Sequence, residues 1–286
     1  MRLAPKHHAE WLTWAHLQEG TQHQIRLGGE WVDVVEMGRG EPLVLVPGLA
    51  GNWRLLVPLA RRLARRNRVI LPGLRGDRFP LGAPWVGELG EYARDLAGVI
   101  GQLGLERPTV FGVSFGGAIA LELAVEQPHR LGGLIVQGME ARFRMTQGAA
   151  IARRVLERFP LPSDNRFVNQ FFNLLHGCRP EPGPLVDFVV ERCWETDQSV
   201  IARRIALLES FDVSGRLWRI DVPTLVLAGS RDVIVPASRQ RALASAIPGA
   251  RFEELEGAGH IGFLTHYREI ARHVRRMMAR VNHSHC

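Results

Sequence analysis

The stretch Pro108-Thr109-Val110-Phe111-Gly112-Val113-Ser114-Phe115-Gly116-Gly117 decides the fold class of this chain. Its first six residues form an apolar run that is typical of a buried strand, and a helix is expected from Phe115 to Glu126. A serine between a buried strand and a helix, with a glycine two positions away on each side, is the arrangement of a nucleophile elbow. Gly112 and Gly116 remove side chains that would clash with neighbouring backbone in so sharp a turn. An ordinary serine N-cap is the alternative, but a cap needs no glycine on both sides.

Short apolar runs and helical segments alternate on both sides of this stretch. The alternation predicts an α/β fold, with a mostly parallel eight-stranded sheet and helices on both faces. The predicted strands are Gln22–Leu27, Trp31–Met37, Leu43–Val46, Arg68–Leu71, Pro108–Val113, Leu134–Gln137, Thr224–Ala228 and Arg251–Leu255. The predicted helices of this part of the chain are Leu55–Arg66, Leu89–Leu103, Phe115–Glu126, Ala237–Ala246 and Tyr267–Arg280.

The alternation stops between about Met139 and Trp218, where no run fits a buried strand. Four helices are expected there instead, at Ile151–Arg158, Arg166–Leu175, Leu185–Trp194 and Val200–Phe211. An all-helical insertion between two strands predicts a cap, or lid, built on one end of the sheet. We therefore expect a core of residues 1–138 and 219–286, with a helical extension at 1–20, and a cap of residues 139–218.

One predicted cap helix carries an apolar stripe. Its members recur at one-sided helical spacing and are Phe167, Phe171, Phe172, Leu174 and Leu175. The stripe predicts either packing of the cap onto the core or an apolar wall of a substrate pocket, since ligand pockets are mostly apolar. Phe171 and Phe172 are the candidate pocket residues.

A serine hydroxyl is a weak nucleophile and needs a base. Of the eleven histidines, His260 is the best candidate, because it lies in the glycine-bracketed loop Gly257–Ile261 between the last predicted strand and the last predicted helix. A loop at a strand end can reach an elbow above the same edge of the sheet. His266 is the second candidate.

The base in turn needs a carboxylate that holds its tautomer. Asp232 lies just past the predicted strand 224–228, at the carboxyl end of the sheet, and the order Ser, Asp, His along the chain is the one expected with such an elbow. Glu140, after the preceding strand, is the alternative acid, because geometry and not sequence position defines the role.

Two backbone N–H groups are candidates for an oxyanion hole. One belongs to Leu49 in the loop Pro47–Trp53, and the other belongs to Phe115 at the start of the predicted helix, whose positive end favours negative charge. Glycines in the first loop allow a substrate to approach the backbone closely. A glycine turn without any ligand role is the alternative.

The charge of the chain does not point to nucleic acid or to an anionic membrane as partner. The formal net charge is +7, but Lys6 is the only lysine and the arginines are spread along the chain, as on solvated helix faces. Three widely spaced cysteines fit neither a disulfide framework nor a zinc site, so a reducing cytoplasm is expected.

We expect neither a signal peptide nor a membrane span. The N-terminal residues carry charges where a signal peptide needs an apolar run, and no stretch approaches the roughly 20 apolar residues of a span. The sequence also lacks a clustered set of metal ligands and a glycine-rich dinucleotide fingerprint, so neither a metal nor an organic cofactor is expected.

These segments together resemble the α/β-hydrolase superfamily, from Gly29 to the last predicted helix. The resemblance is carried, in the expected order, by Val44–Trp53, Pro72–Asp77, Gly112–Gly117, Gly229–Pro236 and Gly257–Phe263. The chain most resembles esterase and acyl-hydrolase members with a helical cap. Serine at position 114 argues against the activities of haloalkane dehalogenases and epoxide hydrolases, because members with those activities carry aspartate there.

Two loops depart from the pattern of many members. The oxyanion loop reads Pro47-Gly48 where many members have His-Gly, and residues 73–78 read Gly-Leu-Arg-Gly-Asp-Arg where members often have Asp-x-Arg-Gly-His-Gly. Replacement of histidine by Pro47 does not remove the backbone N–H of Leu49, which stays available for the oxyanion hole. The polar network below the oxyanion loop is therefore expected to differ in this chain.

The resemblance implies hydrolysis of a small-molecule acyl substrate, a carboxylic ester or thioester, through an acyl-enzyme on Ser114. His260 would be the base and Asp232 its acid partner. Acyl transfer and carbon–carbon bond hydrolysis with the same triad are the enzymatic alternatives. From other classes, the alternatives are a small-ligand receptor that keeps the fold and a structural partner with a dead site.

Overall fold

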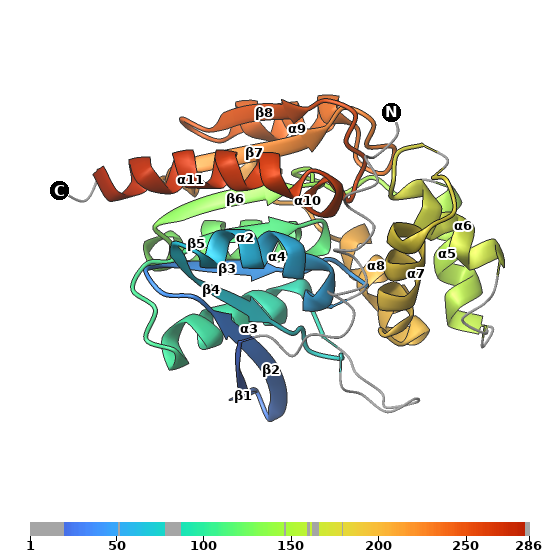
Figure 1. Ribbon diagram of the computed structural model, residues 1–286, viewed down its shortest axis with the longest axis horizontal. Helices are drawn as coiled ribbons and strands as arrows, with labels where there is room; N and C mark the ends of the chain where they lie inside the picture. Colours follow the sequence, from blue (N-terminus) through green and yellow to red (C-terminus); the bar gives the residue numbers. More distant parts are fainter. Residues whose placement is uncertain are drawn as a thin grey trace.

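Eight strands form one sheet in the order β1-β2-β4-β3-β5-β6-β7-β8 (Figure 1). The computed structural model describes residues 20–283 except 51, 78–86, 146, 159–160, 162–165 and 179. The pairs β1–β2 and β2–β4 are antiparallel, and all other neighbours are parallel. Each predicted strand is confirmed, as β1 (Thr21–Leu27), β2 (Glu30–Met37), β3 (Glu41–Val46), β4 (Asn67–Pro72), β5 (Thr109–Val113), β6 (Gly133–Gln137), β7 (Thr224–Gly229) and β8 (Arg251–Leu255). The predicted helical extension at 1–20 lies, apart from Gly20, outside the described residues.

Helices cover both faces of the sheet, because successive side chains along a strand point to opposite faces. On β5, Val110 belongs to the apolar core beneath α3 (Leu89–Gln102), α4 (Phe115–Glu126) and α9 (Ala237–Ala246). Its neighbour Phe111 belongs to the core on the other face, beneath α2 (Val57–Ala64) and α11 (Tyr267–His283). The predicted α/β class and its mostly parallel sheet are confirmed.

Short helices are the main difference from the predicted elements. The helix expected at 55–66 is divided into a 3-10 turn, η2 (Trp53–Leu56), and α2. Pro58 lies in the first turn of α2, where its missing N–H costs no helical hydrogen bond, so it favours a helix start at this point. The other short helices, too short for apolar periodicity to indicate them, are η3 (Pro128–Arg130), η4 (Ser214–Arg219) and α10 (Gly262–Thr265).

Four helices lie between β6 and β7, grouped beyond one end of the strands on the right of Figure 1. They are α5 (Gln147–Arg158), α6 (Arg166–Leu174), α7 (Pro184–Trp194) and α8 (Gln198–Glu209). α5 packs on α8, and α6 packs on α7. The four helices predicted for this insertion are therefore confirmed. Among the helices of the described residues, none is both long enough and apolar enough to cross a membrane.

Candidate functional site

Ser114 stands at the tip of a strained turn between β5 and α4. Its backbone has φ 51° and ψ −118°, a region that residues other than glycine rarely occupy. Hydrogen bonds hold the turn: the N–H of Ser114 donates to the carbonyl of Gln137 on β6 at 2.8 Å, and the N–H of Gly117 donates to the carbonyl of Ser114 at 2.7 Å. The serine side chain is therefore presented at the carboxyl edge of the sheet.

The glycines on either side of Ser114 stand where no side chain fits. A Cβ at Gly112 would lie 2.2 Å from the carbonyl oxygen of Gly116. A Cβ at Gly116 would lie 2.3 Å from the carbonyl oxygen of Val46 and 2.4 Å from that of Pro47. The turn is thus pressed against the end of β3 and against the start of the loop that carries Leu49.

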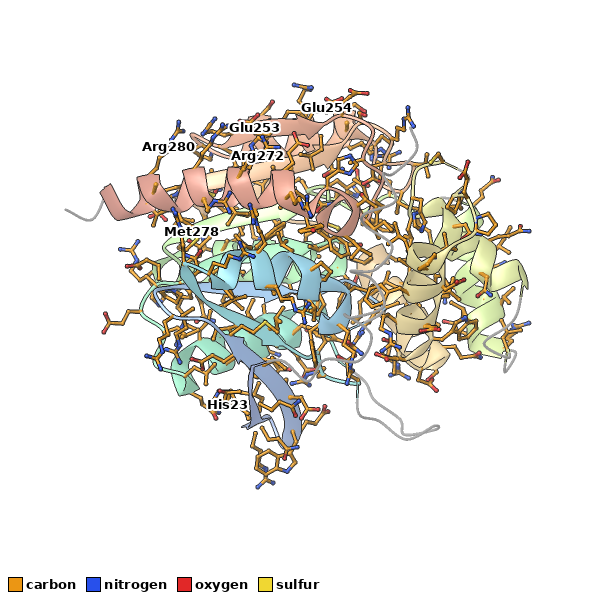
Figure 2. All side chains as sticks on the ribbon, viewed as in Figure 1. His23, Glu253, Glu254, Arg272, Met278 and Arg280 are labelled. Carbon is orange, nitrogen blue, oxygen red and sulfur yellow. The ribbon has the colours of Figure 1, made fainter. Side chains whose placement is uncertain are left out.

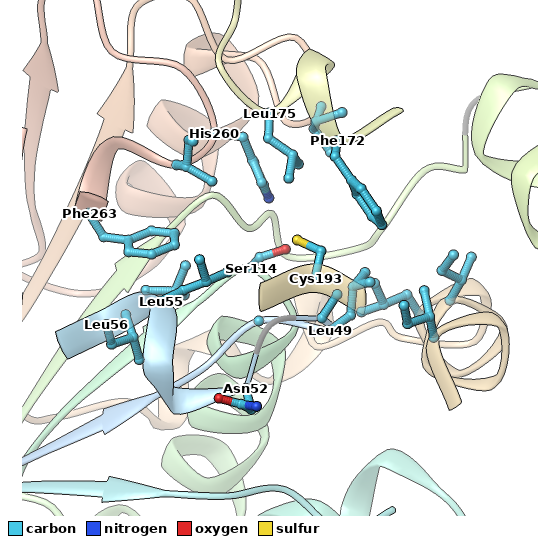
Figure 3. Close-up of a pocket in the computed structure, with 18 of the residues that line it drawn as sticks. Leu49, Asn52, Leu55, Leu56, Ser114, Phe172, Leu175, Cys193, His260 and Phe263 are labelled. Atoms are coloured by element: carbon cyan, nitrogen blue, oxygen red, sulfur yellow. The ribbon is translucent and has the colours of Figure 1, made fainter. Parts of the chain in front are cut away.

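His260 and Asp232 form a buried pair. The Nδ1 atom of His260 lies 2.9 Å from Oδ2 of Asp232, and their side chains are 6% and 1% exposed. Because a carboxylate only accepts, Nδ1 carries the hydrogen and Nε2 is left as the acceptor. In Figure 3 the ring of His260 points toward the hydroxyl of Ser114. The structure therefore brings the three predicted residues together at one edge of the sheet.

Further hydrogen bonds hold the Asp232 carboxylate. Its Oδ1 accepts from the N–H groups of Ile234 and Val235, both at 2.9 Å, and its Oδ2 accepts from the side-chain amide of Gln240 at 3.2 Å. The other end of the Gln240 amide accepts from the N–H of Gly138, just past β6. These donors fix the position of the carboxylate, and with it the orientation of the imidazole of His260.

Gln137 and Gln240 are site residues that the sequence reasoning missed. The Gln137 amide donates to the carbonyl of His260 at 3.0 Å, and both glutamines are fully buried. A glutamine on α9 carries no local sequence signal for such a role. Gln137 ends a buried strand, so its polar side chain in an apolar run was the one signal that could have pointed to it.

The alternative acid and the alternative base have other partners. Glu140 forms an ion pair with Arg239 at 3.2 Å and accepts from the N–H of Arg144 at 3.0 Å. The Nδ1 atom of His266 lies 2.8 Å from the hydroxyl of Thr265. The structure therefore places Asp232, and not Glu140, against the imidazole of His260.

Ser114 and His260 open into an apolar cavity with a volume of about 190 Å³, more than ten times the ~10–15 Å³ that one water needs. Gly48 and Leu49 of the predicted oxyanion loop line the same cavity, and Phe115 follows Ser114 with its side chain fully buried. Among the described residues that line it, the polar side chains are Ser114, His260 and Asn52. Such a cavity suits an uncharged group with one reactive polar centre.

The four helices between β6 and β7 supply a large part of the cavity wall (Figure 3). Their contributions include Leu156, Phe172, Cys193, Ile201, Ile205 and Leu208, and Leu175 follows directly after α6. Burial, with a smaller effect of Glu195, raises the pKa of the Cys193 thiol to about 12, so this side chain is neutral and acts as a small apolar group.

The predicted apolar stripe is only partly correct. Phe172 is buried and lines the cavity together with Leu175. Leu174 is 48% exposed and does not share the face of Phe172, because positions two apart on a helix point to nearly opposite sides, about 200° apart. The side chains of Phe167 and Phe171 lie outside the described residues, so Phe171 as a pocket residue stays a prediction.

The segment after α6 is seated on the loop that carries His260. The N–H of Ile261 donates to the carbonyl of Leu175 at 3.1 Å. A Cβ at Gly259 would lie 2.3 Å from the carbonyl carbon and oxygen of His176, so the two backbones touch. The position of the insertion and the position of His260 are therefore coupled.

His176, at this contact, is a buried histidine with an unsatisfied nitrogen. Within the described part of the chain its Nε2 has no hydrogen-bond partner. Burial lowers the pKa of His176 to about 4. The ring is therefore neutral at neutral pH. Elsewhere among the described ranges, no three His, Cys, Asp or Glu side chains are grouped to hold a metal ion, and the absence of a metal from the reaction stays a prediction.

The chain is similar to known hydrolases over most of its length. A model of the alpha/beta hydrolase family matches residues 43–273. The pimeloyl-[acyl-carrier protein] methyl ester esterase of Stenotrophomonas maltophilia is 30% identical over 85% of this chain and 94% of that protein. The 2-hydroxy-6-oxo-2,4-heptadienoate hydrolase of Pseudomonas putida is 36% identical over 43% of this chain and 47% of that protein. A solved esterase from Thermogutta terrifontis has a TM-score of 0.79 at 25% identity, over 92% of this chain and 99% of that one.

Replacing Gly116→Ala should disrupt the turn, because the new Cβ would lie within 2.4 Å of two backbone oxygens. We expect a loss of about 1–3 kcal/mol in the free energy of unfolding, measured with urea, as for other overpacked positions. Gly215→Ala is the matched control, since nothing lies within 4 Å of a Cβ there. Equal stability of the two variants would contradict the packing described for the turn.

Acid should destabilise the protein through His176. The pKa of His176 is near 6.5 in the unfolded protein and about 4 in the folded protein. The contribution of this group to the free energy of unfolding is therefore fully present above pH 6.5 and is lost as the pH falls toward 4. Between pH 7 and pH 5 the loss from this one group is roughly 2 kcal/mol. Urea unfolding at both pH values should show a smaller decline for His176→Gln than for the wild type, and equal declines would refute the assignment.

Proposed function

Because the chain belongs to the alpha/beta hydrolase family, we propose that it is a serine hydrolase that cleaves a carboxylic ester or thioester of an apolar acyl group. The observation that carries this proposal is the pairing of His260 with Asp232 at 2.9 Å, with Ser114 and His260 lining one apolar cavity. The esterases among the relatives support an ester substrate.

In the first half of the reaction, the Oγ atom of Ser114 attacks the acyl carbon while Nε2 of His260 takes its proton. Asp232 stabilises the imidazolium, and the N–H groups of Leu49 and Phe115 bind the oxyanion of the tetrahedral intermediate. The carbon–oxygen or carbon–sulfur bond then breaks, and the alcohol or thiol leaves with the proton from His260. The acyl group stays on Ser114 as an ester.

In the second half, a water molecule attacks the acyl-enzyme while His260 accepts one of its protons. The second tetrahedral intermediate uses the same oxyanion hole. When it collapses, the proton on His260 returns to Oγ of Ser114 and the carboxylic acid leaves. No cofactor takes part in either half of the proposed reaction.

Residues 139–218 act in this proposal as a lid that shapes the acyl pocket. The apolar side chains that α5, α6, α7 and α8 place in the cavity support this role. The described cysteines, Cys178 and Cys193, are free thiols, in keeping with a reducing cytoplasm as the place of the reaction.

Carbon–carbon bond hydrolysis is the second candidate. The Pseudomonas putida hydrolase supports it, but that match spans only 43% of this chain. Release of acid and alcohol from simple esters, with no new ester formed when another alcohol is added, would separate ester hydrolysis from both carbon–carbon cleavage and acyl transfer.

Ser114→Ala and His260→Ala should each lower the turnover of a p-nitrophenyl ester by several powers of ten, because the two residues act as a unit. Asp232→Asn should also lose most activity, since it favours the wrong tautomer of His260. Glu140→Gln is the matched control and should stay close to the wild type, because Glu140 pairs with Arg239. The assignment of the acid is wrong if Glu140→Gln is inactive and Asp232→Asn is active.

Phe172→Ala should shift the preference toward longer acyl chains, because it enlarges the cavity. The ratio of kcat/KM for the octanoyl ester to kcat/KM for the acetyl p-nitrophenyl ester should rise about 10- to 200-fold, which corresponds to about 1–3 kcal/mol of discrimination. Leu174→Ala on the same helix is the control, because Leu174 points to solvent and should leave the ratio unchanged. An unchanged ratio for Phe172→Ala would mean that the acyl group lies elsewhere.

A further inference from the structure

Arg204 on α8 is a fully buried arginine, 0% exposed, in a part of the molecule that is otherwise mostly apolar. Its guanidinium donates to the carboxylate of Asp77 at 2.7 Å, to the carbonyl of Leu49 at 2.9 Å and to the carbonyl of Arg75 at 3.0 Å. One side chain of the insertion thus ties together the loop after β3 and the loop after β4.

The same guanidinium lies beside the aromatic ring next to Ser114. Its central carbon is 5.8 Å from the ring centre of Phe115 and 5.9 Å from that of Tyr92. Those two rings meet edge to face at 5.0 Å, and the Nε atom of Arg204 reaches the hydroxyl of Tyr92 at 3.5 Å. Arg204 therefore contacts both residues whose backbone N–H groups are assigned to the oxyanion hole, Leu49 and Phe115.

Burial of a cation is unfavourable unless its donors are satisfied. Burial lowers the pKa of the Arg204 guanidinium, but the Asp77 carboxylate and Tyr92 raise it by more, so its pKa lies above the ordinary value. The group stays charged, and a buried charge with fixed partners on four sides resists displacement of any of them. This rigidity is what an oxyanion hole needs, since its donors must be in place before charge develops.

We infer that Arg204 is a positioning residue that fixes both halves of the oxyanion hole from the lid side. The carbonyl of Leu49 accepts from Arg204, a side chain that is not part of the described cavity lining, and this hydrogen bond sets the orientation of the backbone at Leu49. By packing against the Phe115 ring, the guanidinium fixes the first residue of α4. The inference rests on the proposed function, and it adds a condition to it: the lid completes the catalytic geometry as well as the pocket.

Both loops that depart from the family pattern take part in this network, through Leu49 in one and through Arg75 and Asp77 in the other. Asp77, the fifth residue of Gly73–Arg78, is the ion-pair partner of Arg204. In this chain the polar network below the oxyanion loop includes an arginine that comes from the insertion, and its difference from other members stays a prediction. Lysine could not replace it fully, because an ammonium lacks the planar fork that donates to a carboxylate and two carbonyls together.

The test uses two variants. One is Arg204→Lys. The other carries both Arg204→Met and Asp77→Asn, so that the loss of the guanidinium leaves no unpaired carboxylate. Arg154→Met, at an exposed arginine of α5, is the matched control. Near-ultraviolet circular dichroism and the melting temperature establish that each variant is folded. For the folded variants at Arg204, kcat for a p-nitrophenyl ester should fall about 100-fold, the size of effect seen when one oxyanion donor is lost, while KM changes by less than about threefold. The control Arg154→Met should keep the kcat and KM of the wild type.

Inhibitor binding separates positioning of the oxyanion hole from a merely structural role. An alkyl trifluoromethyl ketone forms a tetrahedral adduct with a reactive serine, whereas an alkyl alcohol of the same length only fills the cavity. The Arg204 variants should bind the ketone about 100-fold more weakly and the alcohol almost as the wild type does. Arg154→Met should match the wild type in both.

Two outcomes contradict the inference while leaving the proposed function intact. One is a folded Arg204 variant with wild-type kcat and wild-type affinity for the ketone. The other is an equal loss of affinity for the ketone and the alcohol, which would indicate a misshapen pocket. A wild-type protein that neither turns over esters nor binds the ketone would instead refute the proposed function, and with it the role of Arg204.

Discussion

The close approach of the turn at Ser114 to the end of β3 is the contact on which the rest of the site depends. The backbones are so near that position 116 has no room for a Cβ beside Val46 and Pro47, and within the turn itself position 112 has no room for a Cβ beside Gly116. This contact brings the first turn of α4 next to the loop of Leu49, and Ser114 at the tip of the turn has a positive φ. Because β3 and β6 both neighbour β5, the loops that follow these three strands meet at one edge of the sheet.

Much of this arrangement could be predicted from the sequence, since its signals are local. The run into Ser114, the flanking glycines and the buried runs of the central strands each need only a few neighbouring residues to be recognised. The roles of Gln240 and Arg204 could not be predicted in this way. Gln240 lies in the middle of an ordinary helix, and Arg204 is one of two adjacent arginines on α8, the kind of pair that usually faces water. Only the packing of distant segments makes them buried partners of Asp232 and Leu49.

The choice between Asp232 and Glu140 shows the same limit of sequence. Both follow neighbouring parallel strands, so their positions along the chain are equivalent for the role of acid. The structure separates them through their partners: Asp232 receives two N–H groups and lies against His260, whereas Glu140 lies against Arg239. The difference arises in the turn after β7, where the N–H groups of Ile234 and Val235 hold the Asp232 carboxylate beside His260.

The backbone contact between the insertion and the loop of His260 limits how this protein can be re-engineered and how it can diversify. Backbone touches backbone at Gly259 and His176, and a hydrogen bond joins Ile261 to Leu175 beside them. An insertion transplanted from another protein would have to reproduce this backbone contact after its second helix, or it would displace His260. Positions of α5 and α6 that line the cavity, such as Leu156 and Phe172, are therefore free to vary with the occupant of the cavity, whereas the few residues after α6 must stay matched to the loop of His260.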